Sequence, residues 1–275
     1  MKRKLVTLFL CLFCTTLAFG DITQWMTDMS SHNAGVEVKH GMTFAGNSKI
    51  EMIIHRITIG RYNNPSDADK LFSKRAFETY NEGINFGAYH VAYPSSEAKN
   101  QAQGYIKAIR ELYIPGQRII LSIDWEYTCV KWNYGEDGKK KTCAKEGIVP
   151  PSFVVEFAKE VERLTGKKVI IYTGSYVLKE FRKYFNATPS VVSDLQQYPL
   201  WIARYQGKAA YSFPTEEEIY PWYDWTFWQF AGGEGNGPTK RISPKIQNFP
   251  IDTNFFNGSR EDINKFVEDH AWIVN

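Results

Sequence analysis

Two carboxylates stand two residues apart at the end of an apolar run, in the stretch RIILSIDWEY (118–127). Residues i and i+2 of a β-strand project to the same face, so Asp124 and Glu126 are expected to lie side by side. Neighbouring acids in a partly dry site repel each other, and the pKa of one rises until it holds a proton near neutral pH. Such a pair can protonate a glycosidic oxygen and stabilise the positive charge that develops on the sugar. A solvated strand end or an ion-pair site is the alternative, because D-x-E is a common pattern.

Other acids and several aromatic residues fall at the ends of further predicted strands. Glu37 lies in GVEV (35–38) and Asp252 in IDTNFF (251–256), the first and last predicted strands, which become neighbours if the sheet closes. The aromatic residues at comparable strand ends are Tyr93, Tyr172, Trp201, Tyr205 and Trp228. Aromatic faces around a group of acids suit a polysaccharide, whose sugar rings offer C–H faces. For each aromatic taken singly, packing in the core is the alternative.

Apolar strands alternate with amphipathic helices along residues 35–256. The predicted strands are 35–38, 52–58, 86–92, 118–126, 168–174, 199–205, 226–231 and 251–256, and the clearest helices are 67–82, 95–112, 151–165 and 175–185. Strands that are apolar throughout and separated by helices call for a parallel sheet that is covered on its outer face. About eight such strands in about 250 residues predict a single α/β domain over 21–275, a (β/α) TIM-like barrel with reduced helices in its C-terminal part. A doubly wound open sheet is the alternative, but no glycine-rich phosphate loop follows the first predicted strand.

The N-terminal segment 1–20 has the pattern of a secretory signal peptide: a basic start, a short apolar core and small residues before the expected cleavage site. The chain has 33 Lys and Arg against 30 Asp and Glu, but three of the basic residues belong to this segment, so the mature chain is formally neutral. A neutral chain gives no support for a nucleic-acid partner. We expect a secreted or periplasmic protein with no membrane attachment after cleavage, acting as a monomer.

Only two cysteines remain after that segment, and two cysteines in an exported chain predict one disulfide, Cys129 to Cys143. They bound a polar loop that follows the two carboxylates and carries Trp132, Tyr134 and Lys139–Lys141. This loop is expected either to overhang the groove and contact glycan or peptide, or to be a solvated surface loop. It contains no histidine, and two cysteines alone do not complete a zinc site, so neither a metal nor a cofactor is predicted.

The ordered motifs GVEV, MIIHRITIG, FGAYHVAYP, ILSIDWE, VIIYTG, LWIARY, FWQF and IDTNFF resemble the family-25 glycoside hydrolases, the Chalaropsis-type lysozymes. The resemblance implies a flattened (β/α) barrel that cleaves the β-1,4 bond between N-acetylmuramic acid and N-acetylglucosamine in peptidoglycan. It makes Glu126 the general acid/base, Asp124 the group that orients the substrate's 2-acetamido group, and Asp252 a further acid of the pocket. It also predicts side chains that line or brace the sugar site: Tyr172, Trp201, Arg204 and Gln229. His90 on the third predicted strand is expected either to contact the sugar or to be a structural hydrogen bonder beside the pocket.

Two positions depart from the family pattern. Glu37 stands where the first strand of the family usually carries Asp, and Ile59 stands where an acid commonly precedes the glycine. One extra methylene moves a carboxylate by about 1.5 Å, a displacement that can cost about 100-fold in rate. These departures leave open a catalytically weakened barrel that binds peptidoglycan or another N-acetylated glycan. Hydrolysis of another amino-sugar polymer such as chitin is a third hypothesis.

Overall fold

Eight strands close into a barrel in the computed structural model, which describes residues 25–39, 41–43, 49–94, 96–136, 138–205, 212–232, 245–247 and 249–274. The barrel strands are β1 (Trp25–Met29), β2 (Ile50–Ile59), β3 (Asn85–Val91), β4 (Arg118–Trp125), β7 (Ile170–Gly174), β8 (Leu200–Ala203), β9 (Phe227–Ala231) and β12 (Thr253–Phe256). β4 pairs with β7, which joins the two halves of the sheet. The predicted α/β barrel is thus confirmed, and seven of its eight predicted strands coincide with observed ones.

β12 runs antiparallel to both of its neighbours, β1 and β9, whereas the other barrel strands run parallel to one another. The amino end of β12 therefore lies at the same end of the barrel as the carboxyl ends of the other strands. Asp252, directly before β12, reaches this end because of that reversal. We call this end the mouth.

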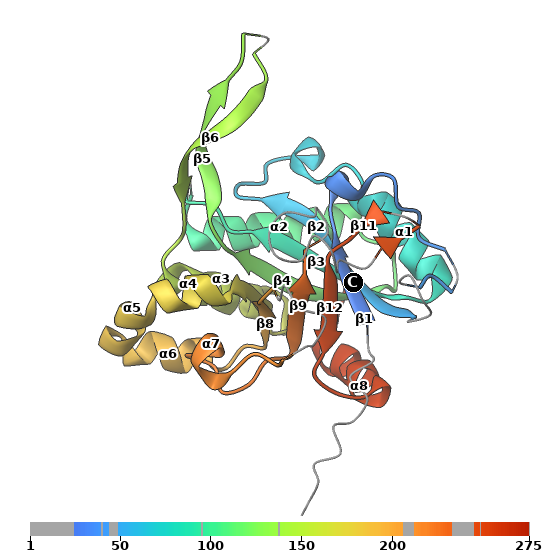
Figure 1. Ribbon diagram of the computed structural model, residues 1–275. Coiled ribbons are helices and arrows are strands. Elements are labelled where there is room, and N and C mark those ends of the chain that lie inside the picture. The colour runs from blue at the N-terminus through green and yellow to red at the C-terminus, as the bar shows by residue number, and fades with distance from the viewer. Residues whose placement is uncertain are drawn as a thin grey trace, which may run out of the picture.

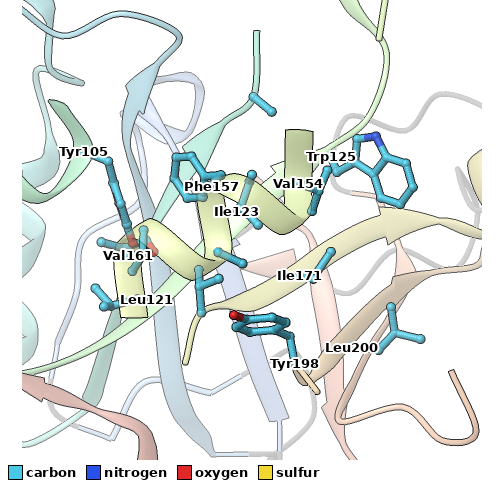
Figure 2. Packing of buried hydrophobic residues seen from close by; sticks show 14 of the residues in the cluster. Tyr105, Leu121, Ile123, Trp125, Val154, Phe157, Val161, Ile171, Tyr198 and Leu200 are labelled. Carbon is cyan, nitrogen blue, oxygen red and sulfur yellow. Dashed lines mark hydrogen bonds between the residues drawn. The ribbon is translucent and has the colours of Figure 1, made fainter. Parts of the chain in front are cut away.

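Successive side chains of β4 point alternately to the outer side of the barrel, where helices cover it, and to the barrel interior. Leu121, Ile123 and Trp125 are fully buried on the outer side of the barrel, where they pack under α3 (Pro151–Thr165) (Figure 2). Ile120 belongs instead to the apolar cluster inside the barrel. Since neighbours alternate, Asp124 shares the inner face with Ile120, and the strand is polar inside only toward the mouth.

Helices cover the first half of the barrel more fully than the second. α1 (Phe72–Glu82) and α2 (Ala98–Leu112) precede α3, and the predicted helix over 175–185 is divided into α4 (Ser175–Glu180) and α5 (Arg182–Ala187), followed by α6 (Pro189–Leu195). Only the four-residue α7 (Glu216–Ile219) lies between β8 and β9 in the described part of that connection. α8 (Arg260–His270) sends Ile263 and Val267 against the interior cluster, below the barrel in Figure 1. The prediction of reduced helices in the C-terminal part is therefore confirmed.

The first predicted strand, GVEV (35–38), is wrong. Residues 35–38 form no strand, and β1 is ten residues earlier, in WMTDM. The alternation in GVEV is real, because Val36 and Val38 are buried against Met29 and Ile53, but this small cluster lies beside the barrel wall. A segment can alternate between apolar and polar residues while it covers a sheet, without belonging to it.

The insert after β4 is a β-hairpin rather than an irregular loop. β5 (Thr128–Tyr134) pairs antiparallel with β6 (Lys140–Gly147), and the disulfide Cys129–Cys143 joins the two strands with a Cα–Cα distance of 5.6 Å. The hairpin projects away from the barrel at the mouth (Figure 1). Short elements complete the fold: the 3-10 turns η1 (Ser31–Asn33) and η2 (Pro65–Asp67), the pair β10 (Lys245–Ile246) and β11 (Phe249–Pro250), and β13 (Trp272–Ile273) on the outer edge of β4. In the described part of the chain, no helix has the length and apolar character needed to span a bilayer.

The disulfide is expected to stabilise the hairpin locally. The chain-entropy limit for a loop of this size is about 3 kcal/mol, but most hairpin side chains are exposed and little of the barrel core depends on them. In a Cys129→Ser/Cys143→Ser variant, amide hydrogen exchange over 128–147 should rise at least about tenfold, while the melting temperature falls by about 3 °C or less. Equal loss of protection in β4 would contradict this and would show that the hairpin and the barrel unfold together.

Candidate active site

Two connected hollows open at the mouth of the barrel. The deep one has a volume of about 170 Å³ and the outer one about 700 Å³. Four residues line both hollows, namely Tyr89, Asp124, Glu126 and Asp252. A ligand that enters the deep pocket therefore remains in contact with the outer one across these acids.

The structure brings Asp124 and Glu126 together as their spacing predicts. Both line the deep pocket, whereas Trp125 between them points to the core and donates its indole N–H to the Val149 carbonyl over 3.0 Å. Asp124 is 8% exposed, and its Oδ1 has no hydrogen-bond partner among the described residues. A buried acceptor without a partner in a pocket is available to a donor on a ligand.

Asp28, near the end of β1, is a buried third acid of the site, and it was not identified from the sequence. Its Oδ1 accepts hydrogen bonds of 2.8 Å from Gln229 Nε2 and from Asn254 Nδ2. Asp252 lines the same deep pocket. The available signal was position: Asp28 is the penultimate residue of the short run WMTDM, whose apolar residues do not alternate regularly with polar ones.

Burial raises the pKa of all three inner acids. For Glu126, burial and then repulsion from Asp28 raise the pKa to about 7. Burial also takes the pKa of Asp124 well above its usual range, with added repulsion from Glu126 and Asp28 and a smaller opposing effect of Arg56. Burial likewise raises the pKa of Asp28, although its hydrogen bonds act in the opposite direction. The site therefore retains protons at neutral pH that exposed carboxyls would lose.

Three residues predicted to form the sugar site do line the deep pocket: Tyr172, Trp201 and Gln229. The Tyr172 hydroxyl donates to Gln229 Oε1 over 2.8 Å, and the indole N–H of Trp201 donates to Asn254 Oδ1 over 2.7 Å. Gln229 Oε1 also accepts from Tyr205 over 2.7 Å. These bonds link the aromatic rings to the two amides that hold Asp28.

The outer pocket contains Tyr93, as predicted for a substrate-binding position, together with Trp132 of the hairpin. Tyr93 is half-buried, and its hydroxyl donates to the carbonyl of Cys129 over 2.9 Å, which ties the base of the hairpin to the barrel. Tyr89 spans both hollows and was not singled out in the sequence, because it alternates with His90 and Val91 in a strand that is apolar overall.

Glu37 is not at the mouth, which corrects its predicted place among the catalytic acids. Its side chain is 57% exposed and forms an ion pair with Lys39 over 2.7 Å. The physical reason is that 35–38 packs beside the barrel, so Glu37 points to solvent while Val36 and Val38 point inward.

Three residues predicted to bind substrate line neither hollow. His90 faces outward from β3, where it is bonded to Thr58 and Gln101 and stacked on Phe157, so it is a structural hydrogen bonder. Trp228 is fully buried under the barrel wall and donates to the Arg204 carbonyl over 2.9 Å. The Arg204 guanidinium leaves β8 toward α7 and binds Glu218 over 2.6 Å. Each lies one residue from an inward-facing position, and the motif alone did not resolve that alternation.

The arrangement provides one acid that is half protonated near neutral pH and further carboxyls that can accept hydrogen bonds or stabilise positive charge. Among the described residues, no group of three or more His, Cys, Asp or Glu side chains has an arrangement that could hold a metal ion. Acid–base chemistry on a neutral polyol or sugar is what these groups can perform unaided.

Comparison with known proteins assigns a class to this arrangement of barrel and acids. The model of glycosyl hydrolases family 25 matches residues 27–236, a segment that includes Asp28, Asp124 and Glu126. The chain belongs to glycosyl hydrolases family 25.

The individual relatives described next share 15% to 27% sequence identity with this chain. YegX of Escherichia coli strain K12, an uncharacterised protein, is 27% identical over 201 residues, which is 73% of this chain and 58% of YegX. Among solved structures, the lysozyme of Streptomyces coelicolor superposes with a TM-score of 0.57 at 20% identity, covering 87% of this chain and 94% of that one. The family-25 lysozyme of Aspergillus fumigatus gives 0.55 at 20% identity, with coverages of 89% and 98%. The modular autolysin LytC of Streptococcus pneumoniae, in complex with a synthetic peptidoglycan ligand, gives 0.52 at 15% identity, with coverages of 85% and 46%.

Replacing Asp28 with Asn should lower the pKa of Glu126. The substitution removes the negative charge that repels ionised Glu126 but leaves burial, the larger cause, in place, so the pKa should fall from about 7 and remain above 4.5. A carbon-13 NMR titration of the glutamate carboxyl groups, assigned with Glu126→Gln, measures the change. Glu37→Gln is the matched control, and an equal shift in that variant would contradict the placement of the two acids.

Proposed function

We propose that this chain is an exported lysozyme that hydrolyses the β-1,4 bond between N-acetylmuramic acid and N-acetylglucosamine in peptidoglycan. The observation that carries the proposal is Glu126, an acid with a pKa of about 7 beside buried Asp124, in a pocket that opens on a large groove. Such an acid is protonated often enough at neutral pH to protonate a leaving sugar oxygen.

Family membership and the names of the structural neighbours support this substrate. Two of the superposed proteins are lysozymes, and LytC is in complex with a synthetic peptidoglycan ligand. The chain spans only 58% of the length of the YegX proteins. These relatives are uncharacterised, so they do not indicate a substrate. The proposal therefore depends on the site and on the family.

In the proposed reaction, Glu126 donates its proton to the glycosidic oxygen as the bond to the anomeric carbon breaks. Asp124 accepts a hydrogen bond from the acetamido N–H through the oxygen that has no partner in the protein, Oδ1. Positioned in this way, the acetamido carbonyl oxygen attacks the anomeric carbon from the opposite face, and Glu126 then takes a proton from the water that opens the intermediate. This is substrate-assisted retention, an exception to the scheme with two protein carboxylates.

The acid supplied by the first strand discriminates between two hypotheses, an active enzyme and a weakened barrel that only binds glycan. The binding hypothesis arose from Glu37 in place of Asp, but Asp28 supplies an aspartate carboxylate from β1 to the pocket. Ile59 does line the outer pocket, where it is 46% exposed and away from the deep pocket. These placements favour turnover over binding alone.

Export and the monomeric state belong to the same proposal. The signal-peptide segment 1–20 lies outside the described residues, and the disulfide Cys129–Cys143 suits an oxidising compartment. We propose a secreted or periplasmic monomer whose partner is the glycan strand of the cell wall.

Glu126→Gln should abolish clearing of a turbid peptidoglycan suspension. Loss of the proton donor is expected to lower the initial rate by about 100- to 10,000-fold, because general acid catalysis contributes on that scale. Glu37→Gln is the matched control and should clear like the wild type, since Glu37 lies outside the pocket. Binding without clearing by the wild type would favour the binding barrel, and mass spectrometry of products from peptidoglycan and chitin oligomers separates the two substrates.

The pH profile should reveal the proton on Glu126. Because only the protonated form can act as the acid, kcat/KM should fall about tenfold per pH unit above a pKa of about 7. Initial rates on a soluble glycan fragment between pH 4 and 9 test this. An alkaline limb that begins below pH 5.5 would show that another group supplies the proton.

A further inference from the structure

The outer pocket has about four times the volume of the deep one, and one of its walls carries positive charge. We propose that this pocket is a subsite for the acidic peptide that is attached to the muramic acid, with Arg61 and His32 as the residues that bind its carboxylates. The inference rests on the proposed function and assigns the part of the substrate that lies outside the deep pocket.

Arg61 carries the positive charge of this wall and His32 adds a ring N–H donor, because the third basic residue of the wall is already neutralised. Arg56 binds Asp69 through Nη2 at 2.8 Å and Nε at 3.2 Å, and Asp69 is buried. In the described part of the chain, the side chains of Arg61 and His32 have neither a hydrogen-bond nor an ion-pair partner, and both are exposed at the pocket. An arginine without a protein partner can bind a carboxylate in a bidentate manner.

The backbone around Arg61 is held in place on both sides. Gly60 adopts a left-handed conformation with φ of +58° and donates its N–H to the Val91 carbonyl over 3.0 Å. A side chain at this position would place its Cβ only 3.0 Å from the Cβ of Tyr93, so the backbone here packs closely against Tyr93. On the other side, Tyr62 is buried and its hydroxyl donates to Glu111. The Arg61 side chain therefore extends from a rigid attachment toward the pocket, which lowers the entropy lost on binding.

His32 is presented by the η1 turn, which is closed by its own polar residues. Ser30 accepts from the His32 amide over 3.2 Å and donates its own amide to Asn33 over 2.9 Å. The Ser31 amide donates to Asp69 over 2.9 Å, so the buried carboxylate that neutralises Arg56 also anchors this turn. The buried ion pair between Arg56 and Asp69 thus supports the turn that carries His32.

Apolar and aromatic groups complete the pocket. Ile59, Val91, Tyr93 and Trp132 contribute to its lining. A peptide that begins with a small apolar residue and then carries carboxylates matches this combination, because the apolar groups can cover its side chains while Arg61 binds the acid. A free inorganic anion would use the charge alone.

Connectivity argues for a substituent of the sugar rather than a separate ligand. The outer pocket joins the deep pocket across Asp124 and Glu126, so a group on a sugar bound between those acids has a direct route into it. Attachment to the bound sugar would also raise the local concentration of the peptide at Arg61.

The test compares peptidoglycan fragments with and without stem peptides, the latter produced by an amidase. We expect wild-type kcat/KM to be about tenfold higher on the peptide-bearing fragments, and the ratio to fall to about one in Arg61→Ala. Arg118→Ala is the matched control, because Arg118 is exposed at the start of β4, at the opposite end of the barrel, and should keep the wild-type ratio. Arg61→Lys should give an intermediate ratio, since lysine keeps the charge and loses the bidentate geometry.

Binding separates this inference from the proposed function. In the inactive Glu126→Gln background, calorimetry with a soluble glycopeptide should show about tenfold weaker binding when Arg61 is also changed to Ala or when the peptide carboxyls are amidated, with no further loss when both changes are combined. An unchanged hydrolysis ratio in folded Arg61→Ala, with the wild type active on both substrates, overturns the subsite and leaves the lysozyme proposal standing. Arg61-dependent binding by a wild-type protein that hydrolyses neither substrate supports the subsite and removes the proposed activity.

Discussion

The crowding of several carboxyl groups in one pocket with little access to solvent is the constraint on which the rest of the site depends. Asp28, Asp124 and Glu126 occupy one pocket, and each ionised group raises the free energy of ionising the next. The protein limits this cost for Asp28 through hydrogen bonds from Gln229 and Asn254, and for Asp124 through the charge of Arg56. For Glu126, no side-chain hydrogen bond is found in the described part of the chain, and its pKa of about 7 leaves its proton available for transfer at neutral pH. The hydrogen bonds thereby distinguish Asp28, as a supporting acid, from the candidate proton donor Glu126.

The reversed strand β12 makes this arrangement possible. A parallel strand at that position would take its amino end, and with it Asp252, to the opposite end of the barrel. Because β12 is antiparallel, Asp252 lines the mouth and Asn254, two residues along, reaches Asp28 inside. One change of strand direction thus supplies both an acid and an amide to the same pocket.

The sequence was sufficient to predict the placement of side chains where the local pattern of residues agrees with their burial. In β4, the spacing of Asp124 and Glu126 placed both acids correctly because a strand alternates wherever it is regular. It was insufficient where two segments compete for one position. GVEV alternates regularly but covers the barrel, whereas WMTDM belongs to the barrel and lacks a regular alternation. His90 and Trp228 show a second limit, since a motif assigned them to the site while the face they present depends on register. The hydrogen bonds that join Tyr172, Tyr205 and Gln229 span distant segments and have no local signature.

The same raised pKa that suits Glu126 to catalysis has a consequence for folding. Its ordinary pKa of 4.5 applies to the unfolded chain and about 7 to the folded protein, so the folded state holds the proton more tightly. The stabilisation that results is fully present below pH 4.5 and is lost as the pH rises through 7. Asp69 acts in the opposite sense. Burial opposes its ionisation, but hydrogen bonds from the backbone amides of Leu71 and Ser31 and nearby positive charge lower its pKa on balance, so its contribution is present above its ordinary pKa and is lost in acid. The protein therefore combines an acid whose ionisation opposes folding with one whose ionisation supports it, and the latter anchors the turn that carries His32.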